Sequence, residues 1–514
     1  TPPFRVPAPA ESLVNTGLTG FFTKNSAKVH SGPDNQRQSQ NAANPRGSPH
    51  CGLPRTALAH KSANAFLLPL FSSSAEPEKP PKICPKTARN PSPGQGRRPA
   101  PKEDASGWVA WRTFLRERLN GFLCDMAAQA KAGYDAPATL TCHMSCPLVP
   151  GATVRGEDYY TTAQGMDILG ITCYLVNRGP AFHQAAMTLD ACESAAACFG
   201  KKAWLIEYNA RTDMPPQEWP RETYAALGRG FKGIFYYQWR ADLPYPDGPE
   251  PEQFGMLYSD GRKASSYDMG VRMNRLVNRL SESLAEAEKV RSGVALLYSD
   301  AANAFSDARD NRGALDTAQC AEQSILALRR CYTLLNQQGL TVDFLRPQEL
   351  AENPLDTRVL ILPYRRGLPT EELEQIEAFQ ASGGRVYEYL DEGLGFRPYA
   401  REQRRVAHGV VTEQYGVSAL CDRENLRPAL RLTGCHGDVD ARLLRGKDAD
   451  WAVLTNYDPL ERPVEGAVLE AQGIRAARAY GEELPEEGVA CPVADGRVLL
   501  PRLAFGGIIR LERA

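Results

Sequence analysis

Residues 202–242 read KAWLIEYNARTDMPPQEWPRETYAALGRGFKGIFYYQWRAD, and this stretch decides the fold class. It holds two short apolar runs, Trp204–Ile206 and Gly233–Tyr237, each of which ends in polar residues that can take part in catalysis. Residues Glu218–Arg229 between them are predicted to form a helix, with a proline tolerated in its first turn. A strand, a helix and a second strand predict a parallel pair. In an α/β barrel, the residues at the carboxyl ends of such strands form the working face.

Glu207 follows the first apolar run directly. Burying a carboxylate without a partner is costly, so this side chain is expected to be paired, protonated or catalytic. Two interpretations stand at this point. Glu207 is either a catalytic carboxylate or one half of a structural ion pair with Arg240, because ion-pair networks also form at strand ends.

The composition excludes several classes of function. The 514 residues suffice for about three domains. Lys+Arg is 60 and Asp+Glu is 61, a net charge of −1, which gives no electrostatic reason to expect nucleic acid or an anionic membrane as a partner. The 13 cysteines show no framework spacing and fit buried thiols in a reducing compartment. No apolar run approaches the roughly 20 residues of a membrane span, so we expect a cytoplasmic protein.

The N-terminal part of the chain divides into two segments. Residues 1–105 are rich in Pro, Ser, Asn, Gln, Lys and Arg and are predicted to be disordered, either as a docking tail or as a leader without structure. Residues 106–290 alternate helices and strands, with predicted strands at Ala138–Met144 and Ile168–Tyr174 before the two described above. This alternation predicts the C-terminal half of a (β/α)8 barrel.

The C-terminal part also divides into two segments. Residues 291–420 predict a doubly wound, flavodoxin-like α/β domain. This segment has no Gly-rich phosphate loop and no Cys or Ser nucleophile elbow, which favours a structural or oligomerisation role. Residues 428–514 hold short strands punctuated by Pro and Gly and predict a small antiparallel β-sandwich. The predicted fold class is therefore α/β: a partial TIM-type barrel, a flavodoxin-like domain and a small C-terminal β-sandwich.

The order of these modules, together with residues 204–242 and the loop at residues 249–258, resembles glycoside hydrolase family 42, the trimeric β-galactosidases. The resemblance extends from about residue 108 to the C-terminus. It implies a TIM barrel, a flavodoxin-like trimerisation domain and a small β-domain. It also implies a retaining hydrolase of terminal β-D-galactosides that works as a homotrimer on a galactoside or oligosaccharide, with no cofactor and no metal.

The resemblance assigns roles where the family's motifs match. The nucleophile of the family's seventh strand falls on Glu207, and the aromatic-Gln-Trp-Arg run at the end of its eighth strand falls on Tyr237–Arg240. The family's Gly-Ala-Glu-x-Phe-His run is here Glu252-Gln253-Phe254-Gly255, so the sugar-binding Glu is kept and the His is replaced by Gly. The candidate substrate-binding residues are Tyr174, Trp219, Trp239, Arg240, Glu252 and His143.

Some of these residues have a second interpretation. Trp219 and Trp239 can stack on a sugar or simply pack the barrel mouth. His143, at the end of a predicted strand, can touch substrate or be a satisfied barrel histidine. Cys142 and Cys146 lack a second pair of ligands, so no zinc site is predicted.

The chain departs from the family at the catalytic acid. Retaining hydrolysis uses two carboxyl groups about 5–5.5 Å apart. The family takes its acid/base from an Asn-Glu pair at the end of the fourth strand, and no Asn-Glu precedes Glu207 in this sequence. The expected activity is therefore impaired. The alternative is a catalytically inactive carbohydrate-binding or assembly protein built on a degraded glycosidase barrel.

Overall fold

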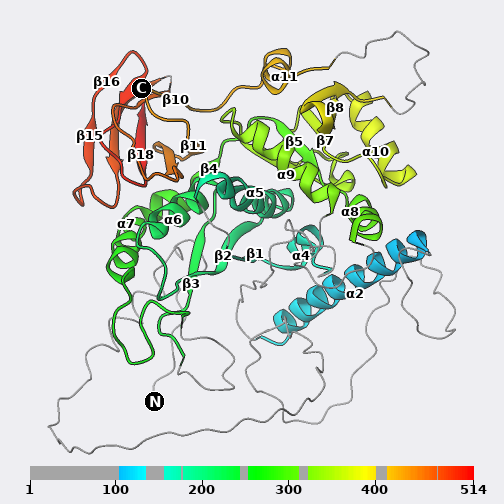
Figure 1. Ribbon diagram of the computed structural model, residues 1–514, viewed down its shortest axis with the longest axis horizontal. Coiled ribbons are helices and arrows are strands. Elements are labelled where there is room, and N and C mark those ends of the chain that lie inside the picture. Colours follow the sequence, from blue (N-terminus) through cyan, green and yellow to red (C-terminus); the bar gives the residue numbers. More distant parts are fainter. Residues whose placement is uncertain are drawn as a thin grey trace, which may run out of the picture.

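The computed structural model describes residues 104–134, 156–174, 178–242, 253–311, 322–400, 414–471 and 473–514. Four sheets organise these residues, with three, four, five and six strands. Figure 1 shows the three-stranded sheet at the centre, with the five-stranded sheet and its helices above it on one side and the C-terminal strands on the other. Apart from its last two residues, the leader predicted to be disordered lies outside the described residues, and so does the predicted strand at 138–144.

The three-stranded sheet is parallel and has the order β1-β2-β3. Its strands are β1 (Ile168–Cys173), β2 (Lys202–Asn209) and β3 (Gly233–Tyr237), joined by the helices α5 (Phe182–Cys198) and α6 (Glu218–Gly228). Both helices lie on the same face of the sheet (Figure 1). The predicted strand-helix-strand unit is thus confirmed. Within the described residues the sheet does not close, so this part of the chain is a partial TIM-type barrel.

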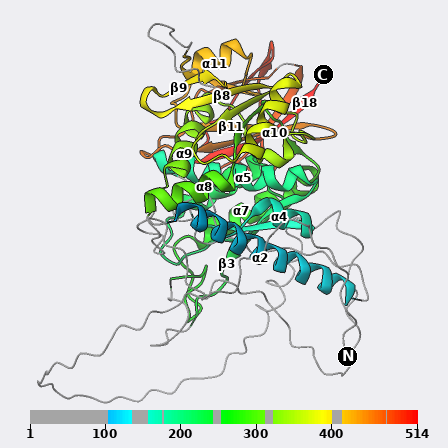
Figure 2. The same ribbon diagram turned by 90° about the vertical axis from the view of Figure 1, so that its right-hand side faces the viewer.

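Three further helices flank this sheet: α2 (Ala105–Ala132), α4 (Tyr159–Gly165) and α7 (Tyr267–Ala285). The long helix α2 lies against α4 and against the five-stranded domain (Figure 2). Its contact with that domain includes a hydrogen bond of 2.8 Å from the Trp108 indole to Asp307 and an ion pair of 3.1 Å from Arg116 to Asp300. The N-terminal helix is therefore fixed by polar contacts to a segment almost 200 residues further along the chain.

The five-stranded sheet has the order β6-β5-β7-β8-β9 and is parallel except for β9. Every residue of β5 and β7 is buried, which explains why these strands read as unbroken apolar runs in the sequence. The elements are β5 (Val294–Leu297), α8 (Asp300–Ser306), α9 (Gln323–Asn336), β6 (Val342–Leu345), β7 (Val359–Leu362), α10 (Thr370–Ala381), β8 (Arg385–Leu390), β9 (Gly395–Pro398) and α11 (Val417–Arg423). The predicted flavodoxin-like domain is confirmed.

The C-terminal strands form two antiparallel sheets, in the orders β15-β14-β18-β12-β11-β4 and β10-β13-β17-β16. Their facing sides share one apolar cluster that includes Leu454, Leu469, Val498 and Ile509, so the predicted β-sandwich is confirmed. The strands are β4 (Glu288–Lys289), β10 (Arg431–Thr433), β11 (Val439–Arg445), β12 (Asp450–Asn456), β13 (Val468–Glu470), β14 (Ile474–Tyr480), β15 (Val489–Cys491), β16 (Val493–Ala494), β17 (Arg497–Leu499) and β18 (Gly506–Arg513). The short strand β4 shows that the linker after α7 already belongs to this sheet.

A largely buried set of charges, which we call the junction network, ties the three parts together. It consists of the cations Arg229, Lys289, Arg291 and Arg442 and the carboxylates Asp190, Glu193, Asp343 and Asp440. Lys289 Nζ lies 3.3 Å from Asp190 on α5 and 3.2 Å from Asp343 on β6, and Arg229 lies 3.1 Å from Asp440 on β11. Because four positive and four negative charges face one another, the network is balanced although it is largely buried.

None of the helices in the described ranges combines the length and apolar character that crossing a membrane requires. No disulfide joins two of the described cysteines, and Cys173 and Cys331 are among those whose side chains are buried.

Candidate active site

Glu207 lies at an irregularity of β2. The pairing with β1 matches Ile171 with Leu205 and then Thr172 with Glu207, so β2 carries one extra residue, Ile206. A bulge of this kind moves the residues that follow it to the opposite faces of the sheet. Glu207 therefore shares the face of Thr172 and not that of Leu205.

The bulge is important because the two faces of the sheet have different surroundings. The face of Leu205 packs against α5 in the main apolar cluster, and it also carries Leu169, Ile171, Cys173, Ala203 and Tyr208. The face of Glu207 carries Gly170, Thr172 and Trp204, and the Glu207 side chain there is only partly buried. Without the extra residue, the carboxylate would face the apolar helix layer, where an unpaired charge is costly.

Tyr174 provides a hydrogen-bond donor to this carboxylate. It follows β1, and its hydroxyl donates a hydrogen bond of 2.6 Å to Glu207 Oε1. A short hydrogen bond from a hydroxyl to a carboxylate is charge-assisted, and it stabilises the ionised form. The structure thus brings together two of the residues that the sequence analysis selected, which lie 33 positions apart.

Aromatic rings lie close to Tyr174 and along the same face of the sheet as Glu207. The ring of Phe254 lies 6.1 Å from that of Tyr174 and 6.0 Å from that of Tyr237 at the end of β3, both in tilted or edge geometry. Deeper along the same face, the Trp204 ring lies 5.4 Å from that of Phe235. A Cβ at Gly233 would come within 2.7 Å of the Trp204 indole, so glycine there makes room for this ring. Such flat apolar surfaces beside a carboxylate suit the faces of a sugar.

The loop that carries Phe254 is tied to the ends of two strands. Gly255 N–H donates to the Ala210 carbonyl at 2.7 Å, and Met256 N–H donates to the Gln238 carbonyl at 2.9 Å. A Cβ on Gly255 would lie 2.4 Å from the backbone nitrogen of Ala241. The histidine that the resemblance leads one to expect at this position therefore has no space here, and the glycine is required by the close approach of two backbone segments.

Arg240 and Trp239 lie just beyond β3. The Arg240 guanidinium is exposed and donates to the Ser259 carbonyl at 2.8 Å through Nε, so the structure gives it a backbone partner in place of the ion pair with Glu207 that was one interpretation of the sequence. The Trp239 ring is partly exposed and lies 5.7 Å from that of Tyr267 at the start of α7.

Trp219 is placed in the interior and does not face the region around Glu207. It is fully buried, its ring lies 4.3 Å from that of Tyr236, and a Cβ at Gly270 of α7 would come within 3.0 Å of it. Of the two interpretations of Trp219, the structure therefore favours packing, because a ring with no exposed surface cannot stack on a sugar. His143 and Glu252 lie outside the described residues.

No second carboxyl group faces Glu207 from the three described strands, because Glu207 is the only acidic residue in β1, β2 and β3. Glu222 on α6 has one property of a general acid, since burial raises its pKa well above the usual range of a carboxyl group. Its surroundings exclude the role, however. Glu222 is buried among the helices close to Cys173, which lies on the helix-covered face. In the described ranges, no group of three His, Cys, Asp or Glu side chains has an arrangement that could hold a metal ion.

The chain is similar to several solved structures, whereas no protein-family model and no curated protein sequence matches it. A β-galactosidase from Bacillus circulans sp. alkalophilus matches with a TM-score of 0.57 at 14% identity, over 79% of this chain and 68% of that chain. A catalytic mutant of a GH42 β-galactosidase from G. stearothermophilus gives 0.56 at 13% identity over the same shares. The apo exo-carrageenase GH42 from Bacteroides ovatus gives 0.53 at 12% identity, over 80% of this chain and 57% of that chain.

The chain has a family 42-like fold. Identities this low establish the architecture only, and the activities of these neighbours differ, since two are β-galactosidases and one is a carrageenase.

Two residues that pair across the loop at Phe254 were not candidates from the sequence. Phe254 lies within a family motif. Its ring contacts arise because its loop pairs with the segment after β2, and no local sequence pattern predicts that pairing. The backbones of Arg211 and Phe254 form an isolated antiparallel β-bridge, and the Arg211 guanidinium donates a hydrogen bond of 3.3 Å to the Gln253 side chain. A polar residue just after the Glu207 strand was the only signal in the sequence that could have pointed to it.

Proposed function

We propose that this chain is a retaining glycoside hydrolase that acts on terminal β-D-galactosides, with Glu207 as its nucleophile and with an activity limited by a weak or absent general acid. The observation that carries the proposal is the hydrogen bond of 2.6 Å from Tyr174 to Glu207 at the carboxyl ends of parallel strands. The family 42-like fold supports it, because the carboxyl ends of barrel strands are where such enzymes place their catalytic groups.

The proposed first step is attack of a Glu207 oxygen on the anomeric carbon. The new bond is a glycosyl ester, and the bond to the leaving oxygen breaks with its electron pair. Tyr174 donates to the carboxylate and holds it in one orientation, which a nucleophile needs. The aromatic rings of Phe254, Tyr237 and Trp239 offer faces for the sugar, and Arg240 and Glu252 remain candidate ligands for its hydroxyl groups.

The step that this site supports poorly is protonation of the leaving group. General acid catalysis typically contributes roughly 10²–10⁴-fold in rate. Leaving groups that depart as stable anions do not need the proton, so a dinitrophenyl galactoside should be turned over far better than a nitrophenyl galactoside or lactose. That order of substrates is the signature of a nucleophile that works without its acid.

A second candidate is a carbohydrate-binding protein that does not hydrolyse its ligand. The observation that favours it is the single carboxyl group on β1, β2 and β3. Such a protein would bind galactosides through the same aromatic rings and would release no aglycone from any of them.

The deciding experiment compares three proteins on 2,4-dinitrophenyl β-D-galactoside. We expect release of dinitrophenol by the unaltered chain, and loss of that release in Glu207→Gln. Glu465→Gln removes a carboxylate that is 60% exposed on the β-sandwich and should behave like the unaltered chain. Equal, blank-level release by all three proteins would reject the hydrolase, and galactoside binding in the same samples would then support the second candidate.

A further inference from the structure

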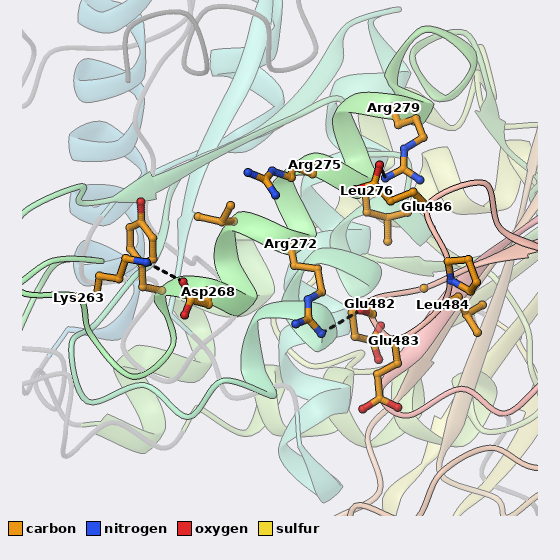
Figure 3. Close-up of a pocket in the computed structure, with 14 residues that line it drawn as sticks. Lys263, Asp268, Arg272, Arg275, Leu276, Arg279, Glu482, Glu483, Leu484 and Glu486 are labelled. Atoms are coloured by element: carbon orange, nitrogen blue, oxygen red, sulfur yellow. Dashed lines mark hydrogen bonds and ion pairs between the residues drawn. The ribbon is translucent and has the colours of Figure 1, made fainter. Parts of the chain in front are cut away.

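A hollow separate from Glu207 lies between α7 and the turn Gly481–Glu486 of the β-sandwich (Figure 3). Its volume is about 670 Å³. The helix lines it with three arginines, Arg272, Arg275 and Arg279, and Lys263 and Tyr267 lie at its end nearest the start of α7. None of these residues has a part in the proposed attack on the sugar.

The three arginines form one row. Their spacing of three and then four residues places them on the same face of a helix. The opposite face of α7 is apolar and buried, with Met273, Val277 and Leu284 in the core. The row is therefore held along the hollow by the packing of the helix behind it.

Most carboxylates around the hollow already have cationic partners. Lys263 pairs with Asp268 at 3.1 Å, and Arg279 pairs with Glu486 at 3.7 Å. Glu483 pairs at 2.7 Å with Arg502, which is not among the residues that line the hollow. These three acidic groups therefore leave the other two arginines of the row uncompensated.

Glu482, the remaining acidic residue, does not neutralise these arginines either. It is 4% exposed, and its side chain accepts hydrogen bonds of 2.6 Å from the Tyr224 hydroxyl and 3.1 Å from the Phe505 N–H. Burial raises the pKa of Glu482, which disfavours its charged form. It is therefore a structural carboxyl group that faces the interior.

Arg272 and Arg275 retain unused donors. Arg272 makes one hydrogen bond of 3.2 Å, to the backbone carbonyl of Glu482, and Arg275 has no hydrogen bond or ion pair with any residue that the structure describes. Figure 3 shows both side chains extending from the helix. Of these two arginines, only Arg272 has a dashed line to another residue drawn in the figure. A guanidinium has five N–H donors in a planar fork that matches the oxygens of carboxylate, sulfate and phosphate groups.

One end of the hollow lies near Trp239, a candidate substrate-binding residue. The Tyr267 ring lines it, lies 4.7 Å from Lys263 Nζ and lies 5.7 Å from the ring of Trp239, which follows β3. A saccharide held at Trp239 would therefore lie next to the Tyr267 ring, which lines one end of the hollow.

We propose that the hollow is a subsite for an acidic saccharide, in which Arg272 and Arg275 bind a sulfate, phosphate or carboxylate group carried by the sugar. The saccharide part of this inference rests on the proposed function, whereas the anion part rests on the arginine row alone. A neutral galactoside offers no negative charge to pair with the two guanidiniums, so the preferred substrate is an anionic oligosaccharide.

The test is calorimetric titration with galactose 6-sulfate, with inorganic sulfate and with galactose. The proteins are the unaltered chain, the double variant Arg272→Gln/Arg275→Gln, and the control Arg475→Gln, whose side chain is 69% exposed on β14. We expect the sulfated sugar to bind best, to lose affinity with added NaCl, and to bind at least about tenfold more weakly to the double variant than to the control.

Equal affinity in the double variant and the control would overturn the proposal. Inorganic sulfate binding as tightly as the sulfated sugar would overturn its saccharide part and leave a plain anion site. The titration needs no turnover. Arginine-dependent binding by a chain that hydrolyses nothing would therefore reject the proposed hydrolase alone, and turnover without such binding would reject the subsite alone.

Discussion

Replacing Lys289 by methionine is expected to destabilise the protein by about 3–5 kcal/mol. The Lys289 side chain is 1% exposed, and its ammonium contacts Glu193, Asp343 and Asp190. Burial alone would lower the pKa of Lys289, but the charges of these three carboxylates raise it overall, so the group is a cation at neutral pH. Methionine keeps most of the volume and removes only the charge.

The magnitude follows from the charge balance of the junction network. Removing Lys289 leaves three cations against four carboxylates, so one buried negative charge loses its compensation. Breaking a buried pair in this way is far more costly than losing a surface pair, for which a median of about 0–1 kcal/mol is typical. Because Asp190, Asp343 and Asp440 come from three different parts of the fold, the loss should loosen the contacts between domains.

The assay is urea unfolding followed by tryptophan fluorescence, with Lys447→Met as a control on an exposed turn, where a change within about 0.5 kcal/mol is expected. A double-mutant cycle adds Glu193→Gln, which removes one carboxylate and restores three charges of each sign. The double variant should lose less free energy of unfolding than the sum of the losses in the two single variants. The reasoning would be refuted if Lys289→Met lowered the free energy of unfolding by no more than the control does. It would also be refuted if the losses in the two single variants simply added in the double variant.

Three other substitutions test the region around Glu207 and the layer of helices behind it. Tyr174→Phe should lower kcat/KM for a dinitrophenyl galactoside by roughly tenfold or more, because the 2.6 Å donor to Glu207 is lost, while the urea midpoint stays near that of the unaltered chain; unchanged kinetics would remove Tyr174 from the mechanism. Glu222→Gln should stabilise the protein increasingly as pH rises. Burial raises the pKa of Glu222 in the folded state. Above about pH 4.3 the unfolded chain therefore loses a proton that the folded chain keeps. The stability of the unaltered chain then falls by about 1.4 kcal/mol per pH unit until the folded pKa is reached. Urea midpoints at about pH 5 and about pH 7 measure this, and a difference between the variants that does not change with pH would contradict it. Gly255→Ala should cost about 1–3 kcal/mol, because its Cβ would meet the Ala241 nitrogen at 2.4 Å, and a midpoint equal to that of the unaltered chain would show that the loop can shift.

Patterns within one element were enough to predict most of the architecture. The apolar runs at Val294–Leu297 and Val359–Leu362 have the length of strands and lie between turn signals, and both are buried strands of a parallel sheet. The run before Glu207 likewise predicted a strand with a carboxylate at its end. These features depend on a few consecutive residues, so they can be predicted from the local sequence.

The details of the candidate site depend on residues far apart in the chain. The burial of Trp219 is caused by Gly270 and Tyr236, and from a local pattern an indole near a strand end reads equally well as a sugar platform. The loop at Phe254 is positioned by hydrogen bonds to Ala210 and Gln238, neither of which has a sequence signature for that pairing. Contacts of this kind appear only when the fold brings the segments together.

The orientation of Glu207 illustrates the same limit and also explains why a nucleophile can persist without its acid. Strict alternation along β2 would place Glu207 on the face of Leu205, beneath the helices. The extra residue Ile206 reverses this, and no rule of composition marks that position as a bulge. The bulge is fixed by pairing with β1 on one side and β3 on the other, and both strands belong to the described sheet. The geometry that aims the carboxylate therefore does not depend on the strand from which the family takes its acid. A site of this construction can keep the attacking group in place while protonation of the leaving group is lost, and this is the reason to test it first with leaving groups that need no proton.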